Sequence, residues 1–119
     1  MVNTNHTLIK KTFDPSNLKR LSEIIGHDMT EKLVQQFIES VPQYLTDLQQ
    51  IIVVNDIEKL RQKIHQFKGE SLQLGATQLG FLCEQIENCI KQEQLANIPI
   101  NLNKMKIEFS HLKVILKLD

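Results

Sequence analysis

The sequence predicts an all-α fold, an antiparallel up-down four-helix bundle with a short N-terminal capping helix. Leucine, isoleucine, glutamine, glutamate and lysine dominate the 119 residues and glycine occurs only four times, a composition that favours helix. Apolar residues recur at steps of three and four along four long segments, and no segment alternates as a strand would. Amphipathic helices joined by short turns bury their apolar sides together, so a bundle is the expected architecture.

Residues 1–12 are polar and weakly periodic, so we expect an N-terminal arm there and the bundle domain over residues 13–119. The domain should begin with a short helix over about 15–25, which Asp14 or Ser16 can cap. Three apolar residues form its predicted inward side: Leu18, Leu21 and Ile25. This helix is expected to cover one end of the bundle.

A long second helix is predicted over about 29–53, after a stop at Gly26. Asp28 and Glu31 have the spacing of a capping box, so Asp28 is the expected N-cap. The main inward residues are Val34, Phe37, Val41, Tyr44, Leu48 and Ile51. Pro42 removes one backbone donor, so we expect it to kink this helix or to split it into two pieces.

The third helix should run from its cap, Asp56, to about Leu74, with Gly75 as its stop. Its apolar or small residues form one continuous seam: Ile57, Leu60, Ile64, Phe67, Ser71 and Leu74. The regular steps of this seam predict that one side of the helix is buried along its whole length.

A fourth helix is predicted over about 77–92, after which the periodicity lapses. Pro99 marks a connection, and a last helix is expected from about Asn101. Cys83 and Cys89 point to different sides of the fourth helix, so they cannot bridge each other and should be reduced thiols.

Fourteen basic residues balance fourteen acidic ones, which argues against a nucleic-acid or anionic-membrane surface. No apolar run reaches the roughly 18 residues of a membrane span, and the N-terminus lacks a secretion signal. We therefore expect a cytoplasmic monomer. The start at Met1 and the lack of kinase or receiver segments favour a free-standing protein.

His65 is the candidate site residue. It follows Ile64 of the seam by roughly 100° around the helix, so its ring can reach solvent while its backbone is held by the core. A neutral imidazole can attack a phosphoryl group, and Lys68, one turn away, can attract the negative phosphoryl oxygens. Gly69, at i+4, leaves the ring uncovered.

These residues, together with Ser71, Leu74, Gly75 and Ala76, resemble the signature of histidine phosphotransfer domains. Three flanking features extend the resemblance: Asp14-Pro15, Gly26-His27-Asp28 and the run from Leu79 to Glu87. Two positions depart from the family pattern, Phe67 where leucine is usual and Glu70 where a small residue is common. Glu70 is expected to alter the rim of the site and to spare the nucleophile.

The resemblance implies a phosphocarrier in a phosphorelay. His65 would accept a phosphoryl group from a sensor (hybrid) histidine kinase or a receiver aspartate and pass it to a response-regulator receiver. Lys68 would steady the phosphoryl oxygens, and Gly69 would admit the partner. Four residues are expected on the docking rim: Gln62, Gln66, Leu72 and Gln73. The protein would need no cofactor of its own, since the receiver would supply Mg²⁺.

The alternative is a non-catalytic bundle that binds receiver domains without carrying phosphate. The chain has no nucleotide-binding motif, so it is not expected to phosphorylate itself or to act as an enzyme in its own right. Glu108 and His111 have the Glu-x-x-His spacing of di-iron bundles, but those need two such motifs and two more glutamates. We therefore expect no metal site.

Overall fold

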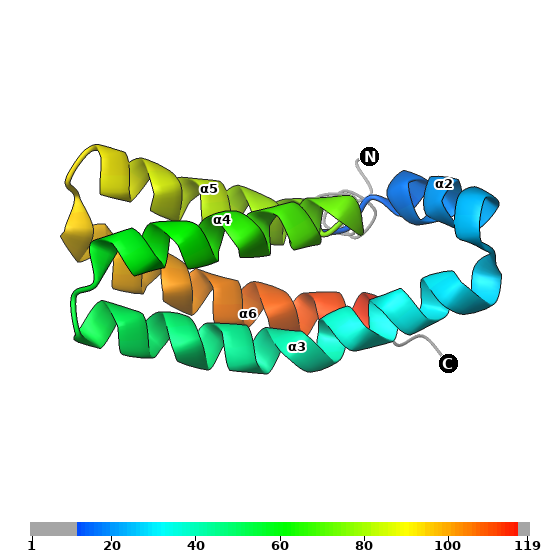
Figure 1. Cartoon of the computed structure of the whole chain (residues 1–119), viewed down its shortest axis with the longest axis horizontal. Helices are drawn as coiled ribbons and strands as arrows, with labels where there is room; N and C mark the ends of the chain where they lie inside the picture. The colour runs from blue at the N-terminus through cyan, green and yellow to red at the C-terminus, as the bar shows by residue number, and fades with distance from the viewer. Residues whose placement is uncertain (1–11, 117–119) are drawn as a thin grey trace, which may run out of the picture.

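The computed structural model describes residues 12–116. Its elements in chain order are α2 (Pro15–Ile25), α3 (His27–Val53), α4 (Ile57–Gln73), α5 (Thr77–Lys91), the 3-10 turn η1 (Leu95–Asn97) and α6 (Ile98–Leu116) (Figure 1). Of the arm expected over residues 1–12, only Thr12 lies within the described range, and its side chain is buried. Every helix in this range is too short or too polar to span a bilayer.

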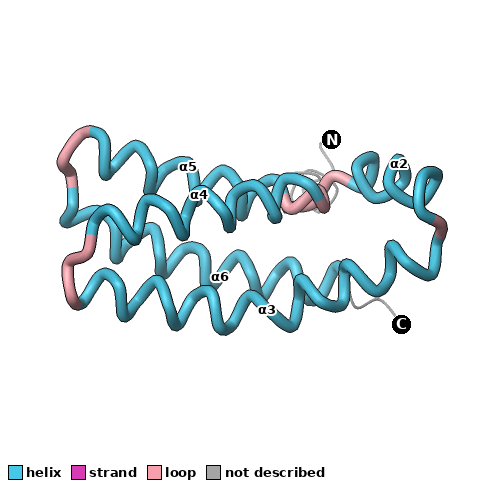
Figure 2. The backbone as a smooth tube through the Cα atoms, viewed as in Figure 1, coloured by secondary structure: helices cyan, strands magenta, loops and turns pink. Residues whose placement is uncertain are grey.

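Helices α3 to α6 lie side by side, and each runs antiparallel to the next along the chain (Figures 1 and 2). Helix α4 packs against α3 and α5, and α6 packs against the same two helices, which closes a ring of four. Helix α2 lies beyond the end of α4 and folds back onto the first turns of α3. The predicted fold class, a four-helix bundle with an N-terminal capping helix, is therefore confirmed.

The seam of the motif helix is buried as its periodicity predicts. Leu60, Ile64 and Phe67 are at most 1% exposed and join the core formed by the other three bundle helices. Phe67 stacks on Tyr44 of α3 with ring centroids 4.5 Å apart, so the larger side chain fills the space between α3 and α4. This packing fixes the backbone on which His65 stands.

The start of α3 differs from the prediction. The helix begins at His27, its N-cap is Gly26 and no side chain caps it, so Asp28 lies inside the first turn. Gly26 has a φ of 92° and also ends α2, so one glycine makes the whole corner. Glu31 pairs instead with His27, at 3.1 Å.

Two prolines bear on the predicted helix bounds. Pro42 does not split α3, which is helical from His27 to Val53, and the kink expected at this residue stays a prediction. Its side chain is exposed, so the proline ring points away from the core. Pro99 lies in the first turn of α6 rather than in a connection, because a missing N–H costs nothing there.

Two smaller expectations concern Ile25 of α2 and the two cysteines of α5. Ile25 is 38% exposed and does not face the core, because α2 lies past the end of the bundle. Cys83 and Cys89 are buried free thiols, as predicted, and burial raises the pKa of Cys83 to about 12. Cys83 is therefore an inert core residue and not a reactive group.

Candidate functional site

His65 lies in the middle of α4 with 73% of its side chain exposed, although its neighbour Ile64 is completely buried. The prediction that the ring leaves the apolar seam is therefore correct. The side chain stands on a rigid, well-packed helix, so its position is defined by the core beneath it.

A carboxylate on the neighbouring helix holds the ring in place. One oxygen of Glu87, on α5, lies 2.9 Å from Nδ1 of His65. The other oxygen lies 2.6 Å from Nζ of Lys68. Glu87 is only 14% exposed at its side chain, so these two contacts occur where α4 and α5 meet. Sequence reasoning noted Glu87 within the run that follows the motif but gave it no role.

The contact with Glu87 determines which ring nitrogen is free. A carboxylate only accepts hydrogen bonds, so Nδ1 of His65 carries the hydrogen and donates it to Glu87. In the neutral ring the lone pair is then on Nε2, the nitrogen farther from the backbone. The site thus presents one exposed nucleophilic nitrogen whose tautomer is set by a neighbouring acid.

The two charged groups beside the ring stabilise each other. Burial raises the pKa of Glu87, but hydrogen bonds from Lys68 and His65 outweigh burial, so the pKa falls below its usual range. The hydrogen bond to Glu87 raises the pKa of Lys68, against an opposing effect of desolvation. Both side chains are therefore charged at neutral pH. Lys68 is therefore held by a carboxylate of the protein and is not freely solvated.

Gly69 faces open space. A Cβ built on this residue would have no heavy atom within 4 Å, apart from its own helix backbone. No contact between helices therefore requires a glycine at this position. This agrees with the prediction that Gly69 leaves the His65 ring uncovered. Gly75 and Gly80 differ, since a Cβ at Gly75 would collide with the Asp14 carbonyl and one at Gly80 with the Leu72 side chain. Gly75 therefore lets the backbone of Asp14 approach, and Gly80 lets α5 approach α4 at Leu72.

The four predicted rim residues are all exposed, and all belong to α4: Gln62, Gln66, Leu72 and Gln73. Leu72 is 41% exposed and its side chain packs over Gly80 of α5. The backbone carbonyl of Leu72 accepts a hydrogen bond from Asn17 of α2, at 2.7 Å. The rim is therefore a continuous outer face of α4, tied to α2 at one end.

The other described histidines lack such an environment. His27 is 75% exposed and pairs with Glu31 at the start of α3. His111 lies 3.7 Å from the buried Glu108 on α6, without a second acid or a lysine. His6 lies outside the described residues. Within residues 12–116, no group of three or more His, Cys, Asp and Glu side chains is arranged to hold a metal ion.

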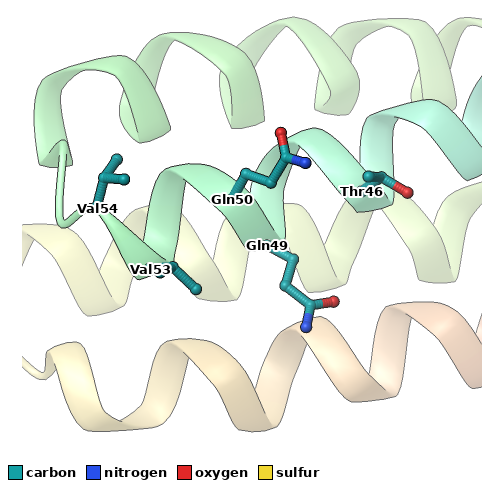
Figure 3. Close-up of a pocket in the computed structure, with 5 residues that line it drawn as sticks. All are labelled: Thr46, Gln49, Gln50, Val53 and Val54. Atoms are coloured by element: carbon teal, nitrogen blue, oxygen red, sulfur yellow. The ribbon is translucent and has the colours of Figure 1, made fainter.

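A hollow of about 600 Å³ lies at the C-terminal end of α3, beside the turn into α4. Figure 3 shows its lining residues: Thr46, Gln49, Gln50, Val53 and Val54. These side chains carry no charge and no group that titrates near neutral pH. This hollow therefore offers no candidate for a nucleophile or an acid–base group.

Known proteins resemble this chain in architecture and in sequence. The structure resembles the crystal structure of histidine-containing phosphotransfer protein B (HptB) from Pseudomonas aeruginosa PAO1, with a TM-score of 0.83 and 26% identity, over 90% of this chain and 92% of that one. The chain is also 32% identical over 82 residues to multistep phosphorelay regulator 1 of Schizosaccharomyces pombe. That match covers 66% of this chain but only 28% of the relative. A model of the Hpt domain matches residues 32–114, more than half of the chain, so this protein belongs to the family of histidine-containing phosphotransfer (Hpt) domains.

Proposed function

We propose that this protein is a phosphocarrier that accepts and donates a phosphoryl group through Nε2 of His65. The observation that carries the proposal is the exposed imidazole whose Nδ1 is held by Glu87. Nε2 attacks the phosphorus of an aspartyl phosphate, the N–P bond forms, and the P–O bond breaks to return a carboxylate to the donor. The reverse reaction passes the group on to a second aspartate.

Glu87 supports this transfer electrostatically. When Nε2 bonds to phosphorus, the ring keeps its hydrogen on Nδ1 and becomes positively charged. The Glu87 carboxylate 2.9 Å away stabilises that charge without having to move. The acid is thus a positioning residue, which sets the tautomer before transfer and balances the ring charge after it.

Lys68 has a second task in this proposal. Its ammonium pairs with Glu87 in this structure and lies one helical turn from His65. The ammonium can turn toward the phosphoryl oxygens when these arrive. Gly69 keeps the space beside the ring open, and the rim of glutamines and Leu72 offers polar and apolar contacts to a docking protein.

The partners that we infer are response-regulator receiver domains and a sensor or hybrid histidine kinase. The receiver would supply the phosphorylated aspartate and the Mg²⁺ that balances its charge, while this chain supplies the nucleophile.

The decisive test is chemical. The purified protein is incubated with a phosphorylated receiver domain, and the label that it acquires is tested for stability. We expect a phosphate that is labile in acid and stable in base, and that is absent from His65→Gln. A bundle that only binds receivers would form the complex without gaining any label, and that result would reject the phosphocarrier.

A further inference from the structure

A second recess lies close to the motif, between α3 and α4. It has a volume of about 390 Å³. Its α3 wall includes Leu33, Phe37 and Tyr44, and its other wall includes Glu70, Gln73 and Leu74. The recess is therefore mainly apolar and aromatic, with one carboxylate among its lining side chains.

Within residues 12–116, no ion pair balances the charge of that carboxylate. Glu70 is half-buried, yet no lysine, arginine or histidine of residues 12–116 forms an ion pair with it. The Tyr44 hydroxyl lines the same recess, and burial together with the nearby Glu70 carboxylate raises its pKa. One neutral donor leaves most acceptor sites of a carboxylate open. The Glu70 carboxylate can therefore accept hydrogen bonds from a cation that a partner brings into the recess.

An arginine side chain matches both features of the recess. Its planar guanidinium can lie against aromatic rings such as Phe37 and Tyr44, and its fork of N–H groups can bind a carboxylate through two hydrogen bonds. We propose that this recess receives an arginine of the receiver domain that docks over His65, with Glu70 as its ionic partner. This inference rests on the phosphotransfer function proposed above.

The recess is close enough to His65 for one partner to cover both. Glu70 follows His65 by five residues, which is about 7.5 Å along the helix axis and about 140° around it. A standard protein interface buries about 800 Å² on each side, equivalent to a disc of about 16 Å radius. Gln73, on the predicted rim, is itself part of the recess wall. A receiver without the arginine would cover Glu70 and leave its charge unpaired, so Glu70 would select among receivers.

The experiment uses the full chain and isolated receiver domains phosphorylated with acetyl phosphate. Native protein, Glu70→Gln and Glu58→Gln are first labelled with phosphoramidate, a small donor that needs no docking. Glu58 is the matched control, since it is an exposed glutamate on the same helix, far from the recess. We expect all three to label equally. If the native protein takes no label, the proposed function itself fails.

Transfer from the receiver that reacts fastest then tests the recess. We expect Glu70→Gln to lower kcat/KM about tenfold, mainly through KM, as expected for a lost charged hydrogen bond, and Glu58→Gln to leave it unchanged. Surface arginines of that receiver are next replaced by alanine one at a time. One replacement should cause the same loss with the native protein and no further loss with Glu70→Gln.

Two results would overturn the inference while leaving the phosphocarrier intact. In the first, phosphoramidate labels His65 normally and Glu70→Gln accepts phosphate from every receiver as fast as the native protein does. In the second, Glu70→Gln is slow but no receiver arginine is coupled to it. Equal thermal unfolding of Glu70→Gln and native protein shows that the fold is unaffected.

Discussion

The carboxylate of Glu87 lies 2.9 Å from Nδ1 of His65, although the two residues are 22 positions apart in the chain. The contact crosses from α5 to α4 and assigns the hydrogen of the imidazole to Nδ1, which leaves the lone pair on Nε2 for the proposed reaction. The same carboxylate binds Lys68, so one acid organises both the nucleophile and the cation beside it. The site thus consists of three side chains on two helices, and Glu87, the least exposed of the three, contacts both of the others.

The first prediction concerns this acid. Glu87→Ala should slow phosphotransfer by about 10- to 100-fold, the range found where a partner that fixes a histidine tautomer is removed from metal sites. Glu87→Gln should lose less, because its amide oxygen can still accept the hydrogen of Nδ1 while the charge is gone. Rapid-quench assays of transfer from a phosphorylated receiver measure both rates. Equal rates in native protein and Glu87→Ala would show that the contact has no catalytic role.

The second prediction follows from the shifted pKa values. The pKa of Glu87 is lowered in the folded state, so its contribution to stability is complete above the unfolded value of about 4.3 and is lost as the pH falls through the folded value. The pKa of Lys68 is raised, so its contribution is complete below about 10.4 and is lost as the pH rises through the folded value.

The free energy of unfolding therefore gives a test. The difference between native protein and Glu87→Gln should be constant from about pH 5 to pH 9 and should shrink below about pH 4. Urea unfolding followed by circular dichroism at each pH measures this difference. A difference that persists unchanged at pH 3 would contradict the pairing, because the neutral acid cannot bind Lys68 as an ion.

The helices could be located from the sequence because their signals are local. Gly26, Asp56 and Gly75 mark helix ends through their own backbone or side-chain chemistry, and the apolar steps define the buried side. Pro99 was misjudged because a proline in a first helical turn and a proline in a connection look alike in sequence. The same local pattern placed His65 at the edge of the core.

The partner of His65 could not be found in this way. Which residue of α5 faces the ring depends on the register between two helices, and that register is set by packing across the core. Gly80 contributes to it, because only a glycine lets α5 approach the Leu72 side chain so closely. A glycine inside a predicted helix was the available signal for this close contact, but it does not reveal that Glu87 meets His65.

A third prediction concerns the nucleophile. His65→Gln should abolish labelling by both receiver and phosphoramidate, and the melting temperature should stay nearly unchanged. The ring is 73% exposed, and substitutions at such positions usually alter stability by about 0.5 kcal/mol or less. His111→Gln is the matched control, because that side chain is 64% exposed and should keep full labelling. Phosphate on His65→Gln would move the covalent site elsewhere.

The fourth prediction concerns Lys68. Lys68→Ala should slow transfer by at least about tenfold, equivalent to about 1.4 kcal/mol of transition-state stabilisation, because the phosphoryl oxygens lose a cation. Its ion pair with Glu87 is partly shielded from water, so we also expect a loss of about 1 kcal/mol in the free energy of unfolding. Single-turnover kinetics and urea unfolding separate the two effects. A variant that unfolds outright would assign Lys68 to the fold instead.

The last prediction separates folding from docking at Gly69. Because nothing lies within 4 Å of its missing Cβ, Gly69→Ala should stabilise the helix by up to about 1 kcal/mol. Gly69→Gln should fold as well, yet its side chain would lean back over His65 and obstruct a receiver. Transfer from the receiver should therefore slow with side-chain size, while labelling by phosphoramidate changes little.

Gly75→Ala is the contrasting variant, since its φ of 90° and its contact with Asp14 should cost about 1–3 kcal/mol of stability. If Gly69→Gln destabilised the protein as much as Gly75→Ala does, the face beside His65 would be a packing surface and not an open approach for the partner.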